Sequence, residues 1–380
     1  MAKLNVKRKP ERGAPAVIPM VDLRPLLRAA GGGIRARLAE MHAAGQYILG
    51  AQVSGFESEF ASATGALSCV GVGTGTAALE LALRSALGRR KRREVVVPAL
   101  TSLFTAQAVL AAGGRLSIAD VDEDSLLLTS AGAEAAWGPS TTAVAAVHLY
   151  GRPCRLEPLM RLAGGKGAAL IQDACQAHGA RHLGRPLTDF SPYVCYSFYP
   201  TKNLGCLGDG GGVATSSPLV ERLVRLLRDG GRAGGQVAGM AAGNSRLDEM
   251  HACYLRGLLP GLEASNERRA RVAARYYEAL RGCPGLRLPA WSDESVHHLF
   301  VVRAKQRTKL REHLLAAGIQ TGIHYPVPLH RHPAFRDARV AAPPVVAERA
   351  CREILSLPIG VHIRPRDAER VAAEIRRFYT

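Results

Sequence analysis

Residues 68–78 read SCVGVGTGTAA, an apolar strand that passes through a glycine-rich turn into a helix predicted to end near Leu87. Such a turn leaves backbone N–H groups unpaired at the start of a helix, where the helix dipole favours an anion such as phosphate. A tight turn with Thr76 as N-cap explains the segment equally well. A dinucleotide fingerprint fits less well, because the spacing of Gly71, Gly73 and Gly75 departs from GxGxxG.

The chain on both sides of this turn alternates short apolar strands with helices, from about residue 34 to about residue 230. This alternation is typical of a mixed, mostly parallel sheet with helices on both faces, so we predict a large α/β domain. The predicted strands are 68–72, 95–97, 116–118, 143–147, 168–172, 193–198 and 211–214, with helices such as 76–87 and 104–112 between them.

Three parts of the chain are predicted. A basic, disordered tail covers residues 1–18, the large α/β domain covers 19–250, and a small C-terminal α+β domain covers 251–380. The glycine-rich stretch 229–243 has almost nothing to bury and is predicted to be a surface loop. After it we expect long helices at 247–259 and 262–280, followed by the segments 298–302, 308–317, 322–325, 345–355 and 365–379.

The composition is that of a folded globular protein, since 47% of the 380 residues are hydrophobic and 22% are charged. The 50 Lys and Arg against 32 Asp and Glu give a net charge of +18. Most arginines are scattered among Ala and Leu, which does not favour a nucleic-acid partner. The run Arg89-Arg90-Lys91-Arg92-Arg93 is either a solvated connection or an edge that attracts anions, including substrate.

The cysteines and apolar runs restrict the compartment and the metal content. None of the eight cysteines forms a CxxC pair or a Cys/His cluster at zinc spacing, so neither a disulfide framework nor a metal site is expected. No apolar stretch has the length of a signal peptide core or a membrane span. We therefore expect a cytoplasmic protein without a membrane partner.

Asp173 ends a further apolar strand, in the stretch 168–179 that reads AALIQDACQAHG. Open α/β sheets bind ligands at this edge, and a carboxylate there can hold a heteroaromatic nitrogen protonated. The alternative is structural, because Asp173 can N-cap the next turn while Gln176 completes a capping box.

Lys202 lies in an aromatic and apolar turn within residues 193–205, YVCYSFYPTKNLG. Only eight of the 50 basic residues are lysines, and a desolvated Lys, unlike Arg, can lose its proton and form a Schiff base. An ordinary surface lysine is the alternative. A phosphate cradle, an Asp and a Lys at successive strand ends together match the needs of pyridoxal 5′-phosphate (PLP), which uses them as anchor, ring-nitrogen partner and proton carrier.

The order of these segments resembles the nucleotide-sugar aminotransferases, the DegT/StrS-type family of fold type I PLP enzymes, over almost the whole chain. The resemblance rests on Gly50 with Phe56-Glu57, GTGTAAL at 73–79, VHLYGRP at 147–153, DACQAHGA at 173–180, SFYPTKNLG at 197–205, GDGG at 208–211, GNSRLDE at 243–249 and HYPVPLH at 324–330. Within the family, SFYPTKNLG and HYPVPLH look most like the branch that aminates dTDP-linked 3-keto-6-deoxyhexoses.

The resemblance implies roles for the residues that would hold the cofactor. Lys202 is the expected Schiff-base lysine, Asp173 contacts the pyridine nitrogen, and Gln176 lies near the ring hydroxyl. The phosphate is expected on Gly75, Thr76 and Ser197.

The resemblance also implies partners beyond a single chain. Asn244 would reach the phosphate of the cofactor in the neighbouring protomer, which requires a homodimer with shared active sites. Its alternative is a loop residue before a helix capped by Ser245 and Asp248. Contacts to the sugar or the amino donor are expected from Arg246, His324, Tyr325 and His330.

Several histidines also have a structural reading. His324 and His330 can belong to a Pro-stiffened turn with satisfied imidazoles. His148 and His178 are expected to be structural or to support other site residues.

Three features depart from the family pattern. The basic run ending in Arg93-Glu94 replaces the usual Gly-Asp-Glu before the second strand. Ser102 stands where an aromatic residue usually stacks on the pyridine ring, so Phe104 is the candidate replacement. Gln172 stands where an acid usually precedes the catalytic Asp. These departures put cofactor affinity and sugar identity in question and leave Lys202 and Asp173 in place.

The resemblance implies a PLP-dependent aminotransferase with pyridoxamine 5′-phosphate as its intermediate cofactor form. It would move an amino group from glutamate or glutamine to a keto-sugar on a nucleoside diphosphate, in deoxyamino sugar biosynthesis. The alternatives are a 4-keto-sugar aminotransferase, a PLP-dependent sugar dehydratase, and a non-catalytic regulator that binds nucleic acid. Lys202 argues against the dehydratase, whose members carry His there, and a regulator has no use for Lys202 with Asp173.

Overall fold

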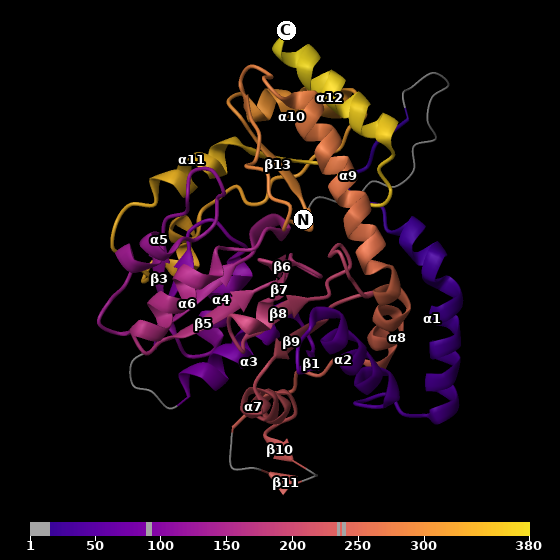
Figure 1. Cartoon of the computed structure of the whole chain (residues 1–380), viewed down its shortest axis with the longest axis vertical. Coiled ribbons are helices and arrows are strands. Elements are labelled where there is room, and N and C mark those ends of the chain that lie inside the picture. Colours follow the sequence, from indigo (N-terminus) through magenta and orange to yellow (C-terminus); the bar gives the residue numbers. More distant parts are fainter. Residues whose placement is uncertain (1–15, 89–92, 234–235, 238–240) are drawn as a thin grey trace.

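The computed structural model describes residues 16–88, 93–233, 236–237 and 241–380 of the chain (Figure 1). The predicted disordered tail lies almost wholly outside these residues, as do the first four residues of the basic run at 89–93. Within the described ranges, no helix is both long enough and apolar enough to cross a membrane.

A large sheet holds every strand that the apolar runs of the first 215 residues predict. Only β9 runs against its neighbours, so the sheet is mixed and mostly parallel, as expected. Its order is β1 (Ser68–Val72), β9 (Gly211–Thr215), β8 (Val194–Ser197), β5 (Ala169–Asp173), β4 (Thr141–Val147), β2 (Glu94–Pro98), β3 (Arg115–Ala119) and β14 (Arg339–Val340).

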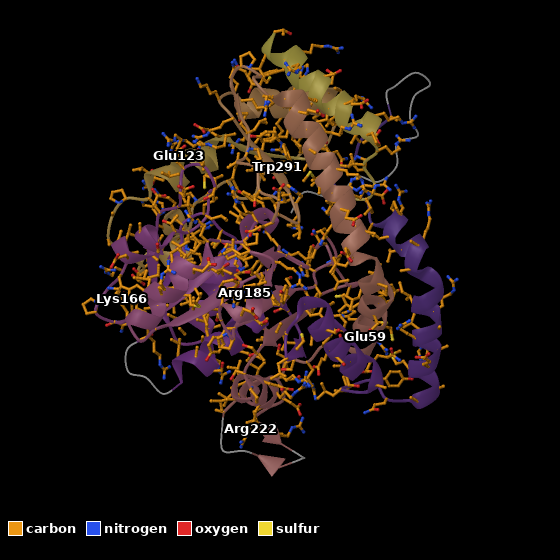
Figure 2. All side chains as sticks on the ribbon, viewed as in Figure 1. Glu59, Glu123, Lys166, Arg185, Arg222 and Trp291 are labelled. Atoms are coloured by element: carbon orange, nitrogen blue, oxygen red, sulfur yellow. The ribbon has the colours of Figure 1, made fainter. Side chains whose placement is uncertain are left out.

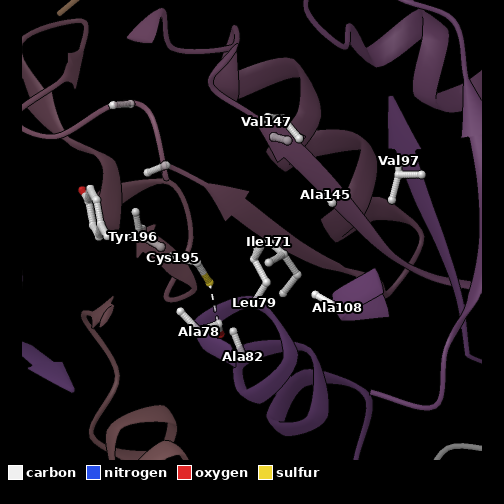
Figure 3. Close-up of a cluster of buried hydrophobic side chains, with 14 of the residues drawn as sticks. Ala78, Leu79, Ala82, Val97, Ala108, Ala145, Val147, Ile171, Cys195 and Tyr196 are labelled. Carbon is white, nitrogen blue, oxygen red and sulfur yellow. Dashed lines mark hydrogen bonds between the residues drawn. The ribbon is translucent and has the colours of Figure 1, made fainter. Parts of the chain in front are cut away.

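Helices cover this sheet because each presents an apolar stripe to it. Helix α3 packs on β5, β8 and β9, whereas α6 packs on β4 and β5. Figure 3 shows Ala78, Leu79 and Ala82 of α3 close to Ile171 and Cys195 of the sheet. The helices of this part are α2 (Ala51–Thr64), α3 (Gly75–Leu87), α4 (Leu103–Ala111), α5 (Ser130–Ala135), α6 (Leu156–Gly165) and α7 (Pro218–Arg228), with a hairpin of β6 (Arg181–His182) and β7 (Arg185–Pro186).

The chain after residue 261 builds most of a second core around a three-stranded antiparallel sheet, whereas residues 249–258 and 345–353 pack into the large core. Helix α9 packs against α12, and Figure 1 shows it running from α8 up to that helix. Near the start of the chain, α1 (Arg24–Ala44) packs on α8. The elements are α8 (Glu249–Leu258), α9 (Leu262–Leu280), β12 (Leu286–Arg287), β13 (Phe300–Ala304), α10 (Arg307–Ala316), α11 (Val345–Glu353), β15 (Ile354–Leu357) and α12 (Pro365–Tyr379).

The two cores are joined by the C-terminal segment and by an ion-pair cluster. Strand β14 pairs with β3 at the edge of the large sheet, and Phe335 belongs to the large core. Glu123, labelled in Figure 2, forms ion pairs with Arg303 of β13 and Arg287 of β12, each at 2.5 Å. The C-terminal part thus contributes to both cores, and the predicted domain limits stay a prediction.

One segment differs from expectation. The stretch 229–243, predicted as a loop, contains the paired strands β10 (Arg232–Ala233) and β11 (Gln236–Val237), which Figure 1 shows projecting beyond α7. Residues 322–325 contribute only one bridge, from Gly322 to Ser356.

Candidate active site

A cavity of about 660 Å³ opens where the carboxyl ends of β5 and β8 meet the N-terminal ends of α3 and α4. The other side of the cavity comes from the N-terminal segment and the C-terminal part of the chain. It is lined by Met20, Val21, Asp22, Leu23, Leu26, Thr74, Gly75, Thr76, Leu79, Thr101, Ser102, Phe104, Thr105, Val147, Asp173, Cys175, Gln176, Ser197, Tyr199, Thr201, Lys202, Asp209, Arg269, His298, Leu299, His324, Tyr325, Ile359, Val361 and His362.

The start of α3 forms one end of the cavity. Thr74, not Thr76, is the N-cap, and its Oγ1 accepts a hydrogen bond of 2.9 Å from the N–H of Ala77. The N–H groups of Gly75 and Thr76 have no acceptor among the described residues. These two free amides at a helix N-terminus suit a phosphate.

Glycines bring the neighbouring strands close to this helix end. A Cβ on Gly75 would lie 2.5 Å from the Cβ of Ser197, and a Cβ on Gly211 would lie 2.1 Å from the carbonyl oxygen of Thr74. Any side chain at either position would push Ser197 or β9 away from the turn. The cradle therefore fits a phosphate group held between the amides of α3 and the hydroxyl of Ser197.

Asp173 is the last residue of β5 and is only 5% exposed. Its Oδ2 accepts a hydrogen bond of 2.8 Å from the hydroxyl of Thr105, and its Oδ1 accepts one of 3.2 Å from the N–H of Cys175. Gln176 does not complete a capping box: its Oε1 accepts from the N–H of Tyr150 at 2.7 Å and its Nε2 donates to the hydroxyl of Tyr325 at 3.2 Å.

Lys202 follows β8 in a turn closed by a hydrogen bond of 2.9 Å from its own N–H to the carbonyl of Tyr199. Burial lowers the pKa of the Lys202 amine, while Cys175 and Asp173 act in the opposite direction. Because burial dominates, the neutral amine is easier to reach than in a solvated lysine. The structure thus places a nucleophilic amine in the same cavity as Asp173.

Asn203, the next residue, fixes the tautomer of a buried histidine that the sequence analysis missed. Its Nδ2 donates to the carbonyl of Val296 at 3.0 Å, so its Oδ1 must accept the hydrogen bond of 3.0 Å from Nδ1 of His298. Burial, and next the charge of Lys202, hold the pKa of His298 well below its usual range. His298 is therefore neutral with a lone pair on Nε2.

The predicted substrate and stacking residues divide into two groups. Ser102 caps α4 by accepting from the N–H of Phe104 at 3.4 Å, and Phe104 is 55% exposed on the cavity wall. Tyr325 lines the cavity, as does His324, whose Nδ1 lies 2.8 Å from the hydroxyl of Ser356. Burial lowers the pKa of His324.

The second group lies outside the cavity lining. Asn244 pairs with Asp229 through an isolated β-bridge, and Arg246 forms an ion pair of 3.1 Å with the same Asp229. His330 lies 2.8 Å from Glu348. Within the described part of one chain, these three side chains do not join Lys202 and Asp173.

Two other histidines support the site from behind. His148 receives the N–H of Cys154 on Nδ1 at 3.0 Å and lies 3.1 Å from Gln172 through Nε2. Its burial lowers its pKa to about 4. His178 lies 2.8 Å from the carbonyl oxygen of Ser197, and burial lowers its pKa to about 3. Both imidazoles are therefore neutral at pH 7.

Comparisons with known proteins agree with this site. The DegT/DnrJ/EryC1/StrS aminotransferase family model matches residues 30–376. The dTDP-3-amino-3,4,6-trideoxy-alpha-D-glucose transaminase of Streptomyces venezuelae is 41% identical over 95% of this chain and 96% of its own. The UDP-N-acetyl-3-dehydro-alpha-D-glucosamine 3-aminotransferase of Acidithiobacillus ferrooxidans is 39% identical over 95% of this chain and 97% of its own.

A solved crystal structure also matches the fold of this chain over nearly its whole length. The crystal structure of S. venezuelae DesV in complex with a ketimine intermediate aligns with a TM-score of 0.92, at 40% identity, over 96% of this chain and 99% of that one. The fold is thus that of fold type I PLP enzymes. From the family match and the free helix amides, Asp173 and Lys202 around one cavity, we conclude that the chain belongs to the DegT/DnrJ/EryC1/StrS family and is a PLP-dependent aminotransferase.

Proposed function

We propose that this protein transfers an amino group from glutamate or glutamine to a keto-sugar linked to a nucleoside diphosphate. The favoured acceptor is a dTDP-3-keto-6-deoxyhexose in deoxyamino sugar biosynthesis. The observation that carries the proposal is the cavity that unites Lys202, Asp173 and the amides of α3. The sugar is argued from the relatives named as 3-aminotransferases of dTDP- and UDP-linked sugars.

The cavity residues divide the work of holding the cofactor. The amides of Gly75 and Thr76 and the hydroxyl of Ser197 bind the phosphate, and the carboxylate of Asp173 holds the ring nitrogen. Gln176, already fixed by Tyr150, orients the ring hydroxyl. PLP, when bound, supplies a ring that stabilises negative charge on the carbon next to the reacting amine.

Lys202 is the proton carrier of this mechanism. Its burial favours the neutral amine, which can take a proton from the donor carbon and would pass it to the cofactor. The same amine makes the reverse transfer when the keto-sugar enters. His298, neutral and fixed by Asn203, lines the cavity with Lys202 without adding a second positive charge.

Two further parts of the proposal concern the assembly and the compartment. Asn244 completes the phosphate site of a neighbouring protomer in a homodimer, which explains why it lies outside the cavity of its own chain. The protein acts in the cytoplasm, which suits its eight free thiols.

Subunit complementation tests the shared site. A protomer with Asn244→Ala and one with Lys202→Ala are each expected to be inactive, whereas their heterodimer holds one intact site of two. Random pairing makes half the dimers mixed, so about a quarter of wild-type activity should return. Verified heterodimers without activity would place each site within a single chain.

The acceptor is tested with a panel of dTDP- and UDP-linked 3-keto- and 4-keto-sugars, glutamate or glutamine as donor, and detection of the amino sugar by mass. Amination of a 3-keto-sugar is the expected result. Preference for a 4-keto-sugar would support the alternative acceptor position, and no amination by cofactor-loaded protein would contradict the proposal. Loss of a hydroxyl without amine transfer would indicate a dehydratase.

A further inference from the structure

The cavity contains a buried arginine that forms no ion pair with the residues discussed so far. Arg269 lies in α9, lines the same cavity as Lys202, and is 6% exposed. Its Nη1 donates to main-chain carbonyls only: His298 at 3.2 Å, and His297 and Ile359 at 3.5 Å.

No acid neutralises Arg269 within the part of the chain that the structure describes. Its Nε is buried without a hydrogen-bond partner, and burial alone lowers its pKa to about 10. The acids that line the cavity do not pair with it: Asp22 is held by Arg24 at 2.7 Å, Asp173 by Thr105, and Asp209 forms no ion pair with it. A buried charge without a counterion is expensive, which points to an anion from outside the chain.

Gly360 and His362 lie beside the guanidinium of Arg269. A Cβ on Gly360, whose φ is 151°, would lie 3.6 Å from Nη2 of Arg269 and 2.8 Å from Nδ1 of His362. His362 cannot neutralise the guanidinium, because an imidazole is either neutral or positively charged. Glycine at 360 therefore lets the chain pass close to His362, which any side chain there would displace.

Arg269 is also close to the chemistry of the site. The positive charges of Lys202 and of Arg269 both act on the buried imidazole of His298. A donor that reaches Lys202 would enter the cavity that Arg269 also lines. The planar fork of an arginine matches a carboxylate, which it binds through two parallel hydrogen bonds.

We propose that Arg269 binds a carboxylate of the amino-acid donor through its guanidinium, which has no acid partner among the described residues. The inference rests on the proposed function and deepens it, because it assigns the donor-binding residue and requires an acidic donor group. A sugar diphosphate is the other anion of the reaction. It fits this place less well, because Arg269 is buried and is the single arginine among the described residues that line the cavity.

The test uses cofactor-loaded protein and glutarate, which has both carboxylates of glutamate but no amine to react. Binding is followed by calorimetry, with the uncharged diamide of glutaric acid as a control ligand. Arg269→Gln should weaken glutarate binding about 10- to 100-fold, the range for a hydrogen bond to a charged group. Arg275→Gln is the matched control, since Arg275 lies in the same helix, is exposed, and pairs loosely with Glu369 at 3.9 Å.

Two kinetic measurements complete the test. The glutamate half-reaction should slow at low donor concentration in Arg269→Gln, whereas the pyridoxamine form should aminate the keto-sugar within about threefold of wild type. Unchanged glutarate binding would overturn the inference and leave Arg269 as a clamp on the carbonyls of His297, His298 and Ile359. Loss of sugar binding with unchanged glutarate binding would assign the site to the diphosphate and also overturn it.

A second variant covers the case in which Arg269→Gln does not fold. Arg269→Lys keeps the charge but lacks the fork, so glutarate binding should weaken about fivefold or more. Binding equal to wild type would contradict the inference. Glutarate binding does not depend on sugar turnover, so failure of every keto-sugar in the panel would refute the proposed function without deciding the role of Arg269.

Discussion

Replacement of Asp173 by Asn separates the catalytic role of this carboxylate from its structural one. The change keeps the shape of the side chain but removes the charge that would hold the ring nitrogen protonated. Loss of one main electrostatic element in a buried site lowers turnover about 10²- to 10³-fold, which corresponds to about 3–4 kcal/mol. Because Asp173 is only 5% exposed, water cannot replace the missing charge.

The structural effect of the same change is smaller. Asp173 accepts from both Thr105 and Cys175, whereas an Asn side chain has one acceptor oxygen and turns its NH2 group toward the other donor. We expect a loss of about 1–3 kcal/mol in unfolding free energy. Thr105→Val is the control, because it removes one of these hydrogen bonds and keeps the charge; it should cost about 1 kcal/mol and less than tenfold in turnover.

The assay is a single turnover with saturating glutamate, corrected for cofactor content by absorbance, together with urea unfolding. If Asp173→Asn retains a rate within tenfold of wild type and loses only stability, the carboxylate is a turn residue and the assignment to the ring nitrogen is wrong. Equal rate losses in Asp173→Asn and Thr105→Val would equally contradict the role of the charge.

Two further predictions concern buried groups behind the site. Glu57 joins the N–H of Gly71 at 2.8 Å to the buried Arg228, so Glu57→Gln should destabilise the fold by about 3–5 kcal/mol in urea, and adding Arg228→Leu should recover part of the loss. His148 has its pKa lowered from 6.5 to about 4 by burial, so the unfolded chain binds the proton more tightly. The contribution of neutral His148 to the free energy of unfolding is therefore present in full above pH 6.5. It falls by about 3 kcal/mol as the pH drops to 4. Unfolding titrations should show a flatter slope over this range in His148→Gln, and an unchanged slope would contradict the buried neutral imidazole.

The sequence was sufficient for seven of the eight strands of the large sheet, because these seven are apolar runs bounded by turn residues; β14 was not predicted. Local capping was harder to predict. Thr74 and Thr76 are chemically alike, and only the backbone angles of the turn make Thr74 the N-cap. The N-cap of helix α2 is Gly50, which has no side chain that could cap the helix. The N–H groups of Gly50 and Val53 instead donate to the carboxylate of Glu249, nearly 200 residues away, at 2.8 Å.

The far side of the cavity was harder still, because it is assembled from distant segments. Arg269 is one of several arginines in the helix that reads LEASNERRARVAARYYEAL. The signal that could have distinguished it is its helical spacing to the buried Val272, Ala273 and Tyr276. The sequence offered less to identify His298 as a cavity residue, because no pattern links it to its hydrogen-bond partner Asn203, 95 residues earlier.

Borohydride reduction of the cofactor-loaded protein, followed by peptide mass mapping, tests the account most directly. Reduction fixes the cofactor to the amine that holds it. We predict that the cofactor mass appears on one peptide, at Lys202, and that Lys202→Ala yields a protein without the absorbance of the lysine-bound cofactor. Modification of Lys166, Lys305 or Lys309 in place of Lys202, or no modified peptide from cofactor-loaded protein, would contradict the account.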